Sequence, residues 1–413
     1  MPASIAGHDL RFDAQGELLP WTSWLRALDL EMDFYRGCPA DRGYPRFVHV
    51  TMLDDEWHAE PGRTDTIPAT QNGMGILSYL KFRTWRGSGA SGCLAVARRM
   101  GDYLVDEALT PDDGAYPAFV RSTGIRDRFP QPADCGSQAD RPHEIEPDKG
   151  GIAAYALLQL AGATGVERYY EHALHHARVL AARQGAGGAA ESPWPFRADW
   201  RDGAGRGRVA GNMTYILRLY DALLARGHRE FAAPRRALWA WIRDHQIPSA
   251  AHGGALFAQF FEDHATPTNR TAWAPLNLAR YLIERRADLD PDWREQAALL
   301  IGFVRRRFTH REYGITVCHE QDEDRNAWGG VAATYGAVLA LFAAATDDHG
   351  IAREARQALN FVQYTIDAAG RPRDLFKRSS PGGWQEDAHT DVIHNVVDAL
   401  RAQPAWAWDG GGA

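Results

Sequence analysis

A repeat constrains this chain more than any other feature. Apolar segments rich in Ala and Gly open after polar loops near Gly73, Gly150, Gly211, Ala272, Gly329 and Thr390. From Gly150 onward the intervals between openings are 61, 61, 57 and 61 residues. The first interval is longer, at 77 residues, because a polar loop is inserted at 121–147. A spacing of this kind indicates one unit of two helices and a short extended segment, repeated along the chain.

A second, more amphipathic series of segments alternates with the first. It comprises residues 94–108, 170–184, 231–246, 293–308 and 353–366. In 293–308 the apolar residues recur at steps of three and four, which places them on one helical face. The segment 330–342 is apolar on nearly every side, so it must be surrounded by protein. The alternation predicts an all-α fold, an (α/α)6 toroid in which an inner ring of helices is wrapped by an outer ring.

Six inner helices need six outer partners, and the two series supply only five. The N-terminal segment at about 21–36, with Trp24, Leu28 and Phe34 available for packing, is predicted to close the ring against the last hairpin. A closed repeat array shares one core and needs no capping repeats. The chain contains no Pro/Ser-rich linker or low-complexity tract. Residues 1–413 are therefore expected to form a single domain.

Composition narrows the possible partners and the cellular location. The net charge is -7 and the arginines are scattered, which argues against nucleic acid as a partner. The four cysteines, Cys38, Cys93, Cys135 and Cys318, lack paired C-x-x-C spacing and are expected to be free thiols in a reducing compartment. No signal peptide pattern and no uninterrupted apolar run of membrane-spanning length is found, so the protein is expected to be cytoplasmic and not membrane-bound. Nothing in the sequence indicates the oligomeric state.

Standard cofactor motifs are not found in the sequence. It contains no H-E-x-x-H, no phosphate-binding Gly loop and no EF-hand spacing, so we expect catalysis without a metal or another cofactor. Calcium or magnesium bound by the acidic run at 322–324 is the main alternative, because these cations prefer oxygen ligands.

The loops that lead into the inner helices are unusually acidic. Acidic runs occur at 54–56, 144–148, 262–263, 320–324 and 386–391. In a toroid these loops meet at one end of the ring, at the N-termini of the inner helices. Any single acid there could be a helix cap that complements the helix dipole, and Asp148 and Asp391 are open to that interpretation. The same bias in five loops favours a functional rim.

Tryptophans accompany the acidic residues of this rim. Trp57, Trp194, Trp200, Trp273, Trp328 and Trp384 lie in or beside the loops. Flat aromatic faces stack on sugar rings, while carboxylates and amides bind sugar hydroxyls. Trp273 and Trp328, at the starts of inner helices, are equally open to interpretation as core residues. The combination of acids and aromatics predicts a saccharide-binding site.

On repeat period, helix alternation and this rim, residues 21–402 resemble the six-hairpin α/α toroid superfamily of glycosidases, lyases and sugar epimerases. The resemblance implies a substrate site at the N-terminal ends of the inner helices and, in many members, hydrolysis by a pair of carboxyls. The specific family is not assigned, because no catalytic aspartate of the cytoplasmic unsaturated glucuronyl hydrolases can be matched to a position here.

The predicted function is hydrolysis of an oligosaccharide, which could contain a uronic acid, by carboxylate acid/base catalysis. One carboxyl must stay protonated to donate to the leaving oxygen, and a second must stay ionised. The candidate catalytic residues are Glu262, Asp263, Glu320 and Asp324. The candidate substrate-binding residues are Trp57, Asp148, Asn212, His264, Arg270, Trp273, His319, Trp328, His389 and Asp391.

Four alternatives remain open. A sugar epimerase of the N-acylglucosamine 2-epimerase type would use histidines, whose pKa lies near neutrality, and His264, His319, His389 and His394 lie on or near the rim. A lyase would use Tyr215 as base and Arg270 to neutralise a uronate. A terpene-type cyclase would need the acidic run at 322–324, although the many other rim carboxylates argue against an apolar cavity. A toroid that only binds a ligand would have all its rim carboxylates in caps and salt bridges.

Overall fold

The computed structural model describes most of the chain. The described residues are 4–37, 40–41, 44–45, 52–53, 67–90, 92–122, 140–141, 143–262, 266–326, 329–372 and 384–408. For some of them, including 384–390, only the backbone is described.

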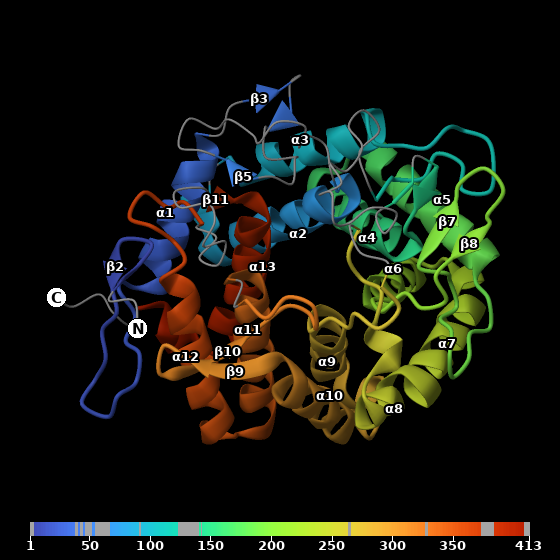
Figure 1. Cartoon of the computed structure of the whole chain (residues 1–413). Helices are drawn as coiled ribbons and strands as arrows, with labels where there is room; N and C mark the ends of the chain where they lie inside the picture. The colour runs from blue at the N-terminus through green and yellow to red at the C-terminus, as the bar shows by residue number, and fades with distance from the viewer. Residues whose placement is uncertain are drawn as a thin grey trace.

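Six inner helices surround the centre of the molecule (Figure 1). They are α2 (Pro68–Arg86), α4 (Pro147–Thr164), α6 (Thr214–Ala225), α9 (Trp273–Arg285), α11 (Gly329–Thr346) and α13 (Glu386–Ala402). Each begins within about one and a half turns of the opening predicted from the repeat. Proline occupies the first position of α2 and α4, where the missing N–H needs no partner and the fixed φ suits a helix.

The outer ring is formed by the amphipathic series. Its helices are α1 (Trp24–Arg36), α3 (Cys93–Asp106), α5 (Glu167–Arg183), α7 (Ala232–Trp241), α10 (Trp293–Phe308) and α12 (His349–Gln363). A π-helical turn at Ile242–Gln246 joins α7 to the short helix α8 (Ile247–Ser249). Pro248 lies at the start of α8, and a proline cannot donate the regular helical hydrogen bond. The predicted (α/α)6 toroid is confirmed.

The inner ring is closed. Each inner helix packs against the next in the order α2, α4, α6, α9, α11 and α13, and α13 packs against α2. The outer helix α1 meets the last hairpin through the 3-10 turn Pro404–Ala407, which follows α13 directly. Asp29 of α1 also forms an ion pair with Arg86 of α2, at 2.9 Å. Closure therefore comes chiefly from the inner helices, with α1 covering the junction from outside.

One continuous hydrophobic core runs through the described chain, from Ile5 to Ala407. Helix α11 is long and apolar enough to cross a membrane by composition, yet 78% of it is buried inside the protein. That burial is what its apolar character on all sides predicts for a helix enclosed by the ring. Cys93 and Cys318 are buried in this core, whereas Cys38 and Cys135 lie outside the described residues.

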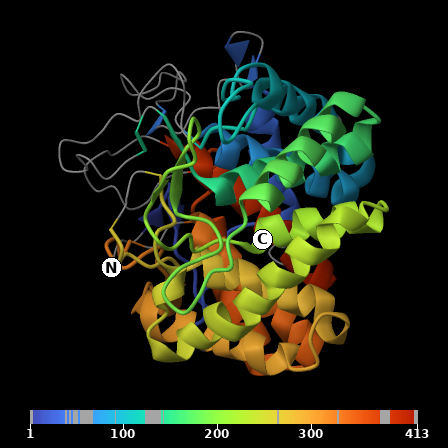
Figure 2. The ribbon, with the colours of Figure 1, turned by 90° about the vertical axis from the view of Figure 1, so that its right-hand side faces the viewer.

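Short strands lie in the connections between the helices, and the β7–β8 segment lies on one side of the ring (Figure 2). The antiparallel pairs are β1 (Ser4–Ile5) with β2 (His8–Asp9), β3 (Ala40–Asp41) with β4 (Tyr44–Pro45), β5 (Met52–Leu53) with β11 (Trp384–Gln385), and β9 (Thr309–Glu312) with β10 (Ile315–Cys318). A three-stranded sheet joins β6 (Glu144–Ile145), β7 (Arg197–Asp199) and β8 (Gly205–Arg206).

Among the connections between outer and inner helices, the segment at 314–320 forms a strand over most of its length. Tyr313 and Gly314 both have positive φ, so a two-residue turn pairs β10 with β9. The segments at 114–120 and 254–262 make only isolated bridges, and 192–197 joins a strand only at its last residue.

Candidate active site

A narrow cavity lies among the N-terminal halves of five inner helices. Its lining residues are Ile67, Thr70, Met74, Ile152, Asn212, Tyr215, Phe260, Phe261, Glu262, Trp273, Asn277, Glu320, Asp391, His394 and Asn395. Thr70, Trp273 and Asp391 lie near the starts of α2, α9 and α13, while Glu262 and Glu320 come from connecting loops. Five of the residues predicted for the hydrolase meet here: Asn212, Glu262, Trp273, Glu320 and Asp391. Tyr215 and His394, named for the alternative functions, line the same cavity.

Glu262 is a buried carboxyl of this cavity whose pKa is raised. Burial raises the pKa of Glu262 to about 7, and the positive charge of Lys149 and a hydrogen bond from Thr70 only partly oppose that effect. The Thr70 hydroxyl donates to Oε1 of Glu262 at 2.7 Å. At neutral pH a large fraction of Glu262 is therefore protonated, which is the state that a general acid requires.

A buried ionic network binds the backbone carbonyl of Glu262. The Arg197 guanidinium donates to the Glu262 carbonyl at 2.6 Å, and the Asp140 N–H donates to the same oxygen at 3.2 Å. Arg197 also pairs with Asp140 and, at 3.2 Å, with Glu146. Because every member is shielded from water, this network resists displacement of the loop that carries Glu262.

Lys149 brings a second positive charge to the same region. Its Nζ lies 3.5 Å from Glu146 and 3.4 Å from Asp148, and it also donates to the Phe260 carbonyl. Burial by itself would lower the pKa of Lys149, but the carboxyls of Asp148, Glu262 and Glu146 outweigh burial and raise it. Lys149 therefore stays charged and limits how far the Glu262 pKa can rise.

The second carboxyl, Glu320, is oriented by Trp273. The indole N–H of Trp273 donates to Oε1 of Glu320 at 2.9 Å. The Glu320 carbonyl accepts from the Ala272 N–H at 2.9 Å, immediately before α9 begins. Trp273 is only 8% exposed, so it belongs to both the core and the cavity wall. Glu320 itself is half-buried, in contrast to the buried Glu262.

Two further groups present unpaired polar atoms in the cavity wall. Neither polar atom of the buried Asn212 amide has a hydrogen-bond partner among the described residues, and the same holds for Nδ1 of His394. A buried polar group without a partner is costly, and a bound ligand is one way to satisfy it. Burial, reinforced by the positive charges of Lys81 and Arg280, lowers the pKa of His394 well below its usual value. His394 is therefore a neutral imidazole at pH 7.

Four predicted residues do not line this cavity. Asp148 is completely buried in the Lys149 network. Arg270 is held by Asp322, which also pairs with Arg307 at 2.6 Å. His319 is buried beside Phe308, and burial lowers its pKa to about 4.

The fourth is Asp324, which accepts a hydrogen bond from the backbone of Asn326 at 2.8 Å, as in a local turn. Trp57, Asp263, His264 and Trp328 lie outside the described residues, as does the side chain of His389. Their roles stay predictions.

Sequence reasoning missed Thr70, Asn277 and Asn395 as lining residues, although a signal was present. In α9 the residues Trp273, Asn277, Arg280 and Glu284 recur at steps of four, three and four, and in α13 Asp391, His394, Asp398 and Arg401 recur at steps of three, four and three. Polar residues at this spacing form one stripe along a helix. In helices enclosed by protein, such a stripe indicates the face that lines the central cavities.

No group of three or more His, Cys, Asp or Glu side chains suitable for a metal ion occurs among the described residues. In the acidic run at 322–324, Asp322 is engaged by Arg307 and Arg270.

Comparison with known proteins supports the fold. No family model matches the sequence, and no curated protein matches it either. Among solved structures, a cellobiose 2-epimerase from Spirochaeta thermophila is similar with a TM-score of 0.62 and 13% identity, over 92% of this chain and 98% of that one.

Two glycosidases have similar folds. A family 76 α-mannanase from Bacteroides thetaiotaomicron gives a TM-score of 0.60 and 11% identity, over 93% of this chain and 97% of that one. An unsaturated glucuronyl hydrolase specific for heparin gives 0.56 and 12%, over 92% and 98%. The chain has the fold of the six-hairpin toroid enzymes.

Proposed function

We propose that the protein acts on a carbohydrate and cleaves a glycosidic bond, with Glu262 as general acid and Glu320 as the ionised carboxylate partner. The observation that carries the proposal is the contrast between two carboxyls of one cavity. Glu262 is buried with its pKa raised to about 7, whereas Glu320 is half-buried and accepts a hydrogen bond from Trp273. A buried carboxyl that keeps its proton and a more exposed carboxyl in the same cavity suit the acid and the base of a glycosidase.

The rest of the cavity wall suits a sugar. Phe260, Phe261 and Trp273 offer aromatic surfaces for the apolar faces of a pyranose ring. Asn212 and Asp391 offer an amide and a carboxylate for its hydroxyls. Glycosidases are also among the proteins with a similar fold.

The test is a pair of conservative substitutions. Glu262→Gln and Glu320→Gln keep the shape of each side chain but remove its ionisable proton. If each residue acts as proposed, kcat falls by about two orders of magnitude or more, since a positioned acid or base contributes that much. Activity is measured on α-mannan oligosaccharides and unsaturated heparin disaccharides, the substrates suggested by similar structures. Thermal unfolding checks that the variants fold.

Glu191→Gln is the matched control, because the Glu191 side chain is exposed and pairs with Arg208 at the surface. It should hydrolyse substrate like the parent protein. Parent-like turnover by both cavity variants would show the assignment to be wrong.

A sugar epimerase is the second candidate, and His394 favours it. A neutral imidazole in the cavity can accept a proton from a carbon beside a carbonyl. A cellobiose 2-epimerase is among the proteins of similar fold. Incubation with cellobiose in deuterated water separates the two functions. Exchange at C2 that is lost in His394→Asn, with no hydrolysis of any glycoside, would establish the epimerase in place of the hydrolase.

A further inference from the structure

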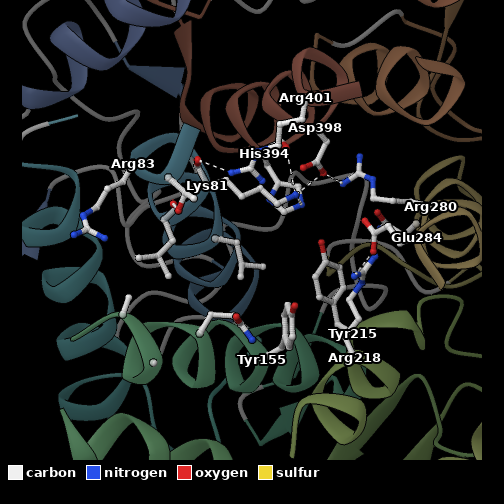
Figure 3. Close-up of a pocket in the computed structure, with 17 residues that line it drawn as sticks. Lys81, Arg83, Tyr155, Tyr215, Arg218, Arg280, Glu284, His394, Asp398 and Arg401 are labelled. Atoms are coloured by element: carbon white, nitrogen blue, oxygen red, sulfur yellow. Dashed lines mark hydrogen bonds and ion pairs between the residues drawn. The ribbon is translucent and has the colours of Figure 1, made fainter. Parts of the chain in front are cut away.

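A second and larger cavity lies at the opposite end of the ring. Its volume is about 540 Å³, and the C-terminal halves of α2, α4, α9 and α13, together with α6, form its walls (Figure 3). It shares Tyr215, Asn277 and His394 with the candidate active site. Arg83 and Arg401, both exposed, lie on its lining where the helices end. It is therefore open to solvent on the side away from the N-terminal ends of the inner helices.

This cavity is strongly basic. Five cationic side chains line it, namely Lys81, Arg83, Arg218, Arg280 and Arg401, against two acidic ones, Glu284 and Asp398. The excess is three positive charges, in a chain whose net charge is -7. Such a local reversal of sign concentrates anions from solution.

The two acidic side chains do not satisfy all the cations. Asp398 is shared, since its Oδ2 lies 2.5 Å from Lys81 Nζ and 3.5 Å from Arg280 Nη1. Glu284 pairs with Arg218 at 2.7 Å. Arg280 is only 2% exposed, and its Nε has no hydrogen-bond partner among the described residues. A buried guanidinium N–H without an acceptor can donate a hydrogen bond to a bound oxyanion.

Lys81 is one of few lysines in the chain, and it lines this cavity. The chain has three lysines, Lys81, Lys149 and Lys377, among 46 basic residues. Burial lowers the pKa of Lys81 to about 8, with the Asp398 carboxylate opposing the effect and the Arg280 charge adding to it. Its side chain is nevertheless 24% exposed, so it can be reached from solvent. A lysine ammonium group binds phosphate as a compact point charge, whereas an arginine guanidinium binds it through paired hydrogen bonds in one plane.

We propose that this cavity binds a small phosphorylated molecule, with Lys81, Arg280 and Arg401 holding the phosphate. Tyr155, Gln159 and Asn277 line the same cavity and can hydrogen-bond the hydroxyl groups of the remainder of the ligand. The volume lies within the range of small-molecule sites. The site is separate from the carboxyls Glu262 and Glu320, so it does not depend on the proposed hydrolysis.

Lysine protection tests the site directly. The full chain is treated with an acetylating reagent at pH 8, with and without inorganic phosphate, at constant ionic strength set by chloride. Mass spectrometry then follows each lysine. We expect phosphate to slow acetylation of Lys81 at least fivefold and to leave Lys377 unchanged. Equal rates at Lys81 with and without phosphate would overturn the proposal.

Binding of phosphate to variants provides the second measurement. Calorimetric titration should give saturable binding that Arg401→Gln weakens at least threefold and Lys81→Gln abolishes. Arg98→Gln, at an exposed arginine of α3, removes the same charge elsewhere and should bind like the parent. If Lys81→Gln does not fold, the exposed Arg401 still decides the outcome. A titration with citrate tests for a polycarboxylate site instead. Binding of citrate without phosphate, or equal weakening by Arg98→Gln, would contradict the proposal.

Discussion

At the scale of single residues, the chemistry depends on what surrounds each polar group. Glu262 and Glu191 are both glutamates that follow an apolar stretch, yet one is 6% exposed beside a buried lysine and the other is on the surface. Burial disfavours the charged form of a carboxyl and so raises its pKa. This is the physical basis for assigning Glu262, and not a surface acid, as the proton donor.

The pH dependence of activity follows from that shift. Because burial raises the pKa of Glu262 to about 7, the protonated acid predominates below pH 7 and declines above it. We expect kcat to fall as pH rises through about 7, by about tenfold per unit once most of Glu262 is ionised. A nitrophenyl glycoside, whose leaving group needs little protonation, allows the residual activity of Glu262→Gln to be measured. The alkaline decline should disappear in that variant, and its persistence would assign the acid to another group.

The unpaired amide of Asn212 leads to a second prediction. Leucine has a similar shape and no polar atoms, so Asn212→Leu removes the cost of burying an unpartnered amide. We expect the free energy of unfolding to stay the same or to rise by about 1 kcal/mol, while KM rises at least tenfold. Urea unfolding and steady-state kinetics measure the two effects.

Asn395→Leu is the control in the same cavity. The Asn395 amide donates to Thr334 and to the Asp391 carbonyl, both at 2.7 Å, and accepts from Arg280. Its removal should cost about 2 kcal/mol or more, because Arg280 loses an acceptor in the interior. A large loss of stability in Asn212→Leu as well would show that Asn212 has a structural role.

At the scale of elements, helix α4 shows how close packing limits the sequence of an inner helix. A Cβ at Gly150 would lie 2.1 Å from Cε1 of Phe119, which is far inside contact distance. A Cβ at Gly162 of the same helix would meet only the flexible end of Arg226, at 3.3 Å. The two glycines are therefore alike in propensity but different in packing.

We expect Gly150→Ala to destabilise the protein by about 1–3 kcal/mol, since overpacking outweighs the gain in helix propensity. Gly162→Ala should be neutral or stabilising by up to about 1 kcal/mol, from propensity alone. Chemical unfolding followed by circular dichroism measures both. Equal effects at the two positions would mean that Phe119 moves aside without cost.

At the scale of the whole molecule, the closed inner ring and continuous core predict cooperative unfolding. Trp24, the first residue of α1, is 2% exposed in the continuous core, and Trp24→Ala should cost about 3–5 kcal/mol. If the chain is one domain, that loss lowers the temperature of a single transition for the whole protein. Scanning calorimetry, with a comparison of calorimetric and van't Hoff enthalpies, measures it. A second transition that keeps the parental temperature would instead reveal an independent part.

The sequence by itself determined the toroid, because a repeat with helical periodicity must bury the same faces in every unit. All six inner helices and five of their outer partners follow from that pattern, and so does the burial of α11. It also predicted that Glu262, Glu320 and Trp273 lie at the same end of the ring, and all three line one cavity there.

Only the tertiary structure decided which rim residues share a cavity. Asp148 and Glu262 look alike in sequence, but Asp148 is buried in the Lys149 network and only Glu262 lines the cavity. Burial, pKa and hydrogen-bond partners depend on side chains that are distant in the sequence, such as Thr70 for Glu262 and Arg307 for Asp322. The basic cavity likewise exists only because Lys81, Arg280 and Arg401 come together when the ring closes, which a local pattern cannot encode.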